Sequence, residues 1–144
     1  MKKKILIIIF IIHILILFKI TVFRSGFGLA GLFASGKLYL MPAVNLIDAY
    51  EHCTRWTFIY LFVGNIIWFV PFGVLLPALT KLNNIKIMLS AALLSFIIEF
   101  MQFAFGTGIS EIDDLILNIL GAFIGLIIYR LILKIRIKKC KQKV

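Results

Sequence analysis

The sequence predicts an all-α membrane protein with four transmembrane helices. The chain has 144 residues, of which 62% are hydrophobic and 15% are charged, and its mean hydropathy is +1.10. Four of its apolar runs are long enough to cross a bilayer, which takes about 20 residues of helix. These runs are apolar on all sides and lack the alternation of barrel strands, so helices are predicted.

The four predicted spans occupy most of the chain, in this order: Ile5 to about Phe23, about Phe58 to Thr80, about Lys86 to Phe105, and about Ile112 to Leu133. We prefer an uncleaved first span to a signal peptide because no small-x-small cleavage motif follows the apolar run. The chain then divides into a first transmembrane helix with an outer loop (1–37), a membrane domain (38–134) and a basic cytoplasmic tail (135–144).

Basic residues are distributed unevenly around the spans. Most of the 16 lysines and arginines precede the first span, flank the turn between the second and third spans, or follow the fourth span. The positive-inside rule therefore predicts a multi-pass protein of the cell membrane with both termini in the cytoplasm. The net charge of +10 follows from this bias and does not indicate a nucleic-acid partner. The partner predicted by composition is the lipid bilayer.

The second span is interrupted by residues that are unusual inside a helix. Asn65 lies about two turns inside it, Pro71 and Gly73 lie near its middle, and Pro77 follows. Proline removes an intrahelical hydrogen bond and bends a helix. We therefore predict that the second helix is kinked at Pro71.

The third span carries Ser95, Glu99 and Gln102 on one helical face, at positions i, i+4 and i+7. Glu99 lies roughly 9 Å from the outer end of this span, and Asn65 and Asn118 lie at a similar depth in their own spans. Ionisable groups at membrane depth are costly and usually face a partner, a cavity or a path. Because Asn65, Glu99 and Asn118 lie at a similar depth in three different spans, we predict a polar site within the outer leaflet.

The fourth span begins with acidic residues and continues with a stripe of small residues. Ser110 and Asp113 have the spacing of a capping box, which gives Asp113 a structural explanation. Asp114 shares a face with Asn118 and can turn toward Glu99. Gly121, Ala122 and Gly125 allow close approach of another helix, within the chain or in a homo-oligomer.

The polar and glycine residues of the second, third and fourth spans together resemble those of a known family, the VanZ-like membrane proteins of bacteria. The resemblance rests on the segment from Gly64 to Gly73, then Glu99-x-x-Gln102, then Asp113-Asp114-x-x-x-Asn118-x-x-Gly121-x-x-x-Gly125, and it covers about Leu38 to Arg130. Many members have an arginine in the loop before the Asp pair. Here that loop reads Gly106-Thr-Gly-Ile-Ser-Glu111, so an anion site would have to do without it or use Arg55.

The resemblance implies an envelope protein that lowers susceptibility to teicoplanin-type glycopeptide antibiotics. A site open to the outer leaflet suits a lipid-linked wall precursor or a lipoglycopeptide with an acyl tail. Carried over by position, the implied ligand-binding residues are Asn65, Glu99, Gln102, Asp113, Asp114 and Asn118, and the implied structural residues are Pro71, Gly73, Gly121 and Gly125. We expect Glu99, Asp114 and Asn118 to form the wall of the site.

Three alternatives stay open. A membrane enzyme could use Glu99, Asp113 and Asp114 to hold Mg²⁺ and hydrolyse a lipid phosphate. No nucleophile–base pair and no Cys/His ligand set is evident, so we name no catalytic residue and predict no other cofactor. The chain could also be a small proton-coupled exporter, or it could modulate a partner membrane protein.

Overall fold

The computed structural model describes residues 2–23, 36–43, 47, 50–52 and 54–142. Within them, four long helices are apolar enough to cross a membrane: α1 (Lys2–Thr21), α3 (Arg55–Leu79), α4 (Asn84–Phe105) and α5 (Ile112–Lys141). The predicted all-α membrane fold with four spanning helices is confirmed. Most of the predicted outer loop, residues 24–35, lies outside the described residues.

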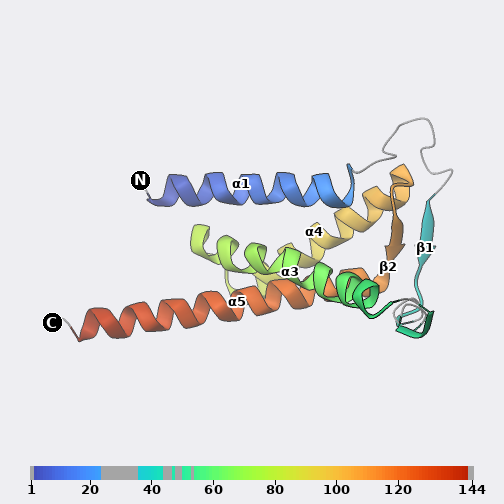
Figure 1. The fold of residues 1–144 in the computed structure, drawn as a ribbon. Coiled ribbons are helices and arrows are strands. Elements are labelled where there is room, and N and C mark those ends of the chain that lie inside the picture. The colour runs from blue at the N-terminus through green and yellow to red at the C-terminus, as the bar shows by residue number, and fades with distance from the viewer. Residues whose placement is uncertain (1, 24–35, 44–46, 48–49, 53, 143–144) are drawn as a thin grey trace.

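The helices form an elongated bundle with distinct ends (Figure 1). The start of α1 and the end of α5 lie at one end, and the short strands β1 (Lys37–Tyr39) and β2 (Ile109–Glu111) lie at the other. This arrangement is that of a bundle crossing a membrane an even number of times. That the end with the termini faces the cytoplasm stays a prediction from the basic residues.

The strand pair was not predicted from the sequence. β1 and β2 pair in parallel, with Lys37 opposite Ile109 and Tyr39 opposite Glu111. Gly36 leads into β1 at a point where the chain touches α4, since a Cβ on Gly36 would lie 2.1 Å from the carbonyl oxygen of Phe103. The pair therefore ties the segment after the first span to the segment between α4 and α5.

The most extensive helix contact joins α3 and α5, and glycines make it possible. A Cβ on Gly73 would lie 2.0 Å from the carbonyl oxygen of Ala122. A Cβ on Gly121 or Gly125 would lie 2.1 Å from the carbonyl oxygen of Ile66 or Val70. The small-residue stripe of the fourth span is therefore used inside the chain, in backbone-to-backbone packing against α3.

Helix α3 continues without a break past both Pro71 and Pro77. The bend predicted at Pro71 stays a prediction. Helix α4 ends at Gly106, whose φ of 61° is left-handed and suits glycine, and whose amide donates to Gln102 and Phe103 carbonyls. After this turn the chain forms β2, whose last residue, Glu111, donates a hydrogen bond to Glu99 of α4.

The core is aromatic and aliphatic and lies between α1, α3, α4 and α5. It contains Leu17, Val22, Phe69, Phe72, Ala91, Ile98 and Ala122. By contrast, isoleucines and leucines on the outer helix faces are largely exposed, as in Ile8 and Leu93. An apolar exterior of this kind suits a bilayer rather than water.

Candidate functional site

Glu99 is a buried carboxylate at the end of the bundle that holds the strands. It lies on α4 with 6% of its surface exposed, and its Oε2 accepts a hydrogen bond from the backbone N–H of Glu111 at 3.0 Å. The N–H belongs to the last residue of β2, so strand pairing positions the donor. Sequence spacing placed Glu99 on the polar face of its helix, and the structure confirms that it is buried there.

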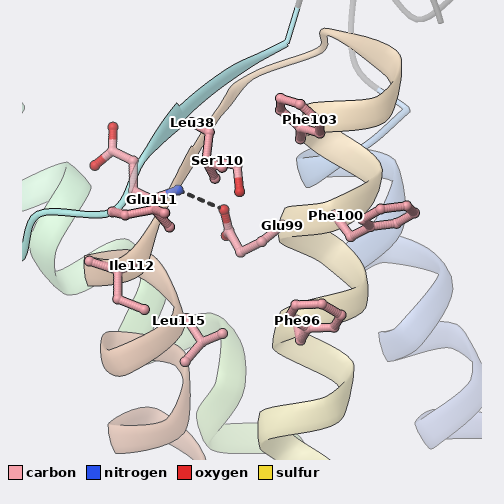
Figure 2. Close-up of a pocket in the computed structure, with 10 residues that line it drawn as sticks. Leu38, Phe96, Glu99, Phe100, Phe103, Ser110, Glu111, Ile112 and Leu115 are labelled. Atoms are coloured by element: carbon pink, nitrogen blue, oxygen red, sulfur yellow. Dashed lines mark hydrogen bonds between the residues drawn. The ribbon is translucent and has the colours of Figure 1, made fainter. Parts of the chain in front are cut away.

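A pocket of about 280 Å³ opens beside this carboxylate. Figure 2 shows Glu99 pointing from α4 toward the start of α5, with the Glu111 N–H directed at it. The other walls are almost entirely apolar: Leu38 and Leu40 from the β1 segment, Phe96, Phe100 and Phe103 from α4, and Ile112 and Leu115 from α5. The pocket therefore combines a polar side, formed by Glu99 and the Ser110–Glu111 segment, with an otherwise apolar lining.

The aromatic wall of this pocket was missed by the sequence argument, which considered polar residues only. Phe96, Glu99, Phe100 and Phe103 lie at i, i+3, i+4 and i+7, which is one helical face. The Phe96 and Phe100 rings stack with centroids 6.4 Å apart. The same periodicity argument, applied to aromatic residues around the acid, would have found this wall.

Asp114 takes a different partner and lines a different pocket. Its Oδ1 accepts a hydrogen bond from Asn65 Nδ2 on α3. Both residues line a second pocket of about 220 Å³, together with Gln102, Thr21, Tyr60 and Trp68 among others. No residue lines both pockets. The predicted single polar site is therefore divided, with Glu99 in one pocket and Asn65, Gln102 and Asp114 in the other.

The predicted capping box of the fourth span does not form. Ser110 lies in β2, α5 begins at Ile112, and its N-cap Glu111 makes no side-chain capping bond within the described residues. Pairing with β1 holds Ser110 in an extended strand, away from the first turn of α5. Asp113 instead accepts the backbone N–H of Ala43, at 2.9 Å and 3.0 Å to its two oxygens.

Asn118 lies on α5, one turn after Asp114, and pairs with Ser95 of α4. Its Nδ2 donates to Ser95 Oγ at 2.9 Å, and both side chains are almost fully buried. Asn118 is not among the described residues that line these two pockets, and its place in a ligand site stays a prediction. The pair links α4 to α5.

We predict a modest coupling energy between Asn118 and Ser95. In a double-mutant cycle of Asn118→Ala and Ser95→Ala, we expect an interaction of about 0.6 kcal/mol, the average for hydrogen bonds between membrane helices. Reversible unfolding in mixed detergent micelles measures it. Strictly additive single and double variants would contradict the pairing.

The carboxylates at this end face each other rather than cations. The charges that act on Glu99 are those of Asp114 and Glu111, and the charges that act on Asp114 are those of Glu111 and Asp113. In the described part of the chain, no lysine or arginine forms an ion pair with Glu99 or Asp114. A buried carboxylate of this kind favours a ligand that brings positive charge or hydrogen-bond donors.

The magnesium alternative required Glu99, Asp113 and Asp114 to converge. Their carboxylates take three separate partners, namely the N–H of Glu111, the N–H of Ala43 and the amide of Asn65. Among the residues that the structure describes, no group of three His, Cys, Asp or Glu is placed to hold a metal ion. A magnesium site stays a prediction from the sequence alone.

Comparisons with known proteins place this arrangement in context. A family model described as VanZ/LLP1 matches residues 10–133. Over 70 residues the chain is 37% identical to Protein VanZ from Enterococcus faecium, a stretch that covers 48% of this chain and 44% of that protein. The chain thus matches less than half the length of this curated relative. No solved structure matches the chain.

Proposed function

Because this chain belongs to the VanZ-like family, we propose that it lowers the susceptibility of its host to teicoplanin-type glycopeptides through the pocket at Glu99. In this proposal the pocket takes a lipid-like ligand at the outer face of the membrane. The ligand is a lipid-linked wall precursor or the acyl-bearing drug itself. The similarity to Protein VanZ of Enterococcus faecium supports the envelope role, and the pocket supports the mode of action.

The observation that carries this proposal is the composition of the pocket. An apolar lining built from phenylalanines and leucines suits an acyl or prenyl chain, because it offers the chain surroundings as apolar as the bilayer core and adds van der Waals packing. The Glu99 carboxylate at its inner wall suits an N–H or O–H donor on the ligand. A ligand that is both apolar and hydrogen-bonding, such as a lipid-linked precursor, fits both features.

The expected position of the pocket also supports an outward-facing role. Strand β2 lies at the end of the bundle opposite the start of α1 and the end of α5 (Figure 1), and its Glu111 N–H donates to Glu99. The positive-inside rule places that end outside the cell. Glycopeptides and the wall precursors they recognise meet the membrane from that side.

We predict that Glu99→Gln removes most of the protection. The substitution keeps the shape of the side chain and replaces a carboxyl oxygen by an amide N–H group, so a ligand N–H or O–H loses its acceptor, at about 1–3 kcal/mol or about tenfold in ligand affinity. The measurement is the minimal inhibitory concentration of teicoplanin in a susceptible Gram-positive host. Wild type and variant are compared at matched membrane abundance.

Glu51→Gln is the matched control, because Glu51 is an exposed acid outside the pocket. We expect it to protect as well as wild type. Equal protection by Glu99→Gln and wild type would exclude the Glu99 pocket as the ligand site. If wild type gave no protection, the proposed function itself would be wrong.

A further inference from the structure

The second pocket differs from the first in position and in chemistry. It lies between α1, α3, α4 and α5. Its lining mixes the polar side chains of Thr21, Asn65, Gln102 and Asp114 with the aromatic rings of Tyr60 and Trp68. The proposed function does not use it. Its volume is about 220 Å³, and its polar side chains suit a polar group rather than an apolar chain.

Two side chains of this pocket, Asp114 and Gln102, offer oxygens that can accept hydrogen bonds from a ligand. The Asn65 amide already donates to the Asp114 carboxylate, and the Gln102 amide donates to the Thr21 carbonyl at 3.4 Å. The Gln102 oxygen Oε1 is buried without a hydrogen-bond partner among the described residues, on a side chain only 8% exposed. A buried oxygen without a partner is costly, so the pocket calls for a donor.

The charge of the pocket points the same way. Asp114 feels the repulsion of Glu111 and Asp113, and no described cation pairs with it. Lys19 is the nearest lysine along α1, next to Ile20 of the pocket lining. Its ammonium instead donates to the carbonyl of Phe23 at 3.1 Å. The pocket thus contains an acidic side chain and an acceptor oxygen without a partner, and no lysine or arginine among the described residues lines it.

We propose that this second pocket binds the primary ammonium group of a membrane lipid headgroup. An ammonium has three donors and no acceptor, which matches the Asp114 carboxylate and the Gln102 oxygen. The face of an aromatic ring adds attraction for a cation, and Trp68 provides the strongest such face.

The lipid bilayer is the expected source because of where the pocket opens. Tyr60 is 75% exposed and Trp68 is 39% exposed, and both lie on the spanning part of α3. Tyr60 lies in the first turn of the span Phe58–Leu79, at the level where tyrosine concentrates beside the lipid headgroups, and Trp68 lies about two turns deeper. A headgroup can therefore enter sideways between α1 and α3 without leaving the bilayer.

The test measures lipid binding, not resistance, so it can fail while the proposed function stands. The purified full chain carries Trp56→Phe, which leaves Trp68 as its only tryptophan; Trp56 is 80% exposed and lines neither of the two pockets. Trp68 fluorescence in a neutral detergent is followed during titration with phosphatidylethanolamine. Phosphatidylcholine is the matched lipid, because three methyl groups replace its N–H donors and its charge is the same.

We expect phosphatidylcholine to bind at least about tenfold more weakly, because its headgroup cannot donate to the two acceptors. Asp114→Asn keeps an oxygen for Asn65 and removes the charge, so it should weaken phosphatidylethanolamine binding by a similar factor. Glu51→Gln should leave binding unchanged. Competition by free ethanolamine at lipid-like concentrations would identify a soluble amine as the source of the ammonium; absence of competition would identify the lipid.

Equal binding of the two lipids by the protein with Asp114 intact would overturn the proposal, because the N–H donors of the headgroup would then make no difference. This comparison needs no variant at Asp114, so it holds even if Asp114→Asn fails to fold. Unchanged phosphatidylethanolamine binding in a folded Asp114→Asn protein would also overturn it.

Discussion

Gly121→Ala is expected to lower the free energy of unfolding of the helix bundle by about 3 kcal/mol, the upper range for overpacking a tight core. The added Cβ would lie 2.1 Å from the carbonyl oxygen of Ile66 on α3. The three nearest atoms are backbone atoms of Ile66, so no side-chain rotation can relieve the clash. Helices α3 and α5 would have to separate, and this contact is the most extensive in the fold.

The same substitution at Gly64 is the matched control. Gly64 lies on α3, and in the described part of the chain nothing lies within 4 Å of a Cβ built there. Alanine is a better helix former than glycine by about 1 kcal/mol, so Gly64→Ala should be neutral or slightly stabilising. Unfolding in mixed micelles compares the two. Similar losses from both variants would contradict the assigned role of the Gly121 contact.

Asp113→Ala is expected to cost about 2–3 kcal/mol, the range for hydrogen bonds to charged groups. The Asp113 carboxylate receives the Ala43 N–H between its two oxygens and is only 6% exposed. Ala43 has a φ of 65°, a left-handed conformation that alanine seldom adopts without support. Removing the acceptor leaves that N–H without its partner and the turn without its tie to α5.

Asp113→Asn is the graded control, because it keeps one acceptor oxygen in the same shape. We expect it to retain part of the stability that Asp113→Ala loses. Thermal unfolding in detergent, followed by tryptophan fluorescence, ranks wild type above Asp113→Asn and Asp113→Ala last. A stability of Asp113→Ala equal to that of wild type would show that the turn does not depend on this carboxylate.

The sequence was most informative where a single helix decides the outcome. Composition and run length predicted the four spans, since a bilayer requires about 20 apolar residues whatever their neighbours are. Helical periodicity placed Glu99 and Gln102 on a buried face, and both are buried. The glycines at 121 and 125 were expected to admit another helix, and they do.

The sequence was least informative where two distant segments meet. Strands β1 and β2 have three residues each, too few for any alternation to be read, and about seventy residues separate them. Because β2 pairs with β1, Ser110 lies in a strand and does not cap α5 as predicted. Asp113 instead accepts a hydrogen bond from the backbone N–H of Ala43, in the segment before α3. Spacing along the fourth span alone could not anticipate a partner in another segment.

The sequence by itself therefore determined the class of protein, the number of spanning helices and the polar residues that face inward. Each of these follows from local hydropathy and helical period. Only the tertiary structure decided which acid meets which partner, because helix rotation and the β1–β2 pairing act between segments. In the tertiary structure Glu99 accepts a hydrogen bond from the Glu111 N–H, and Asp114 accepts one from Asn65. The two acids therefore line two different pockets, where the sequence predicted one polar site.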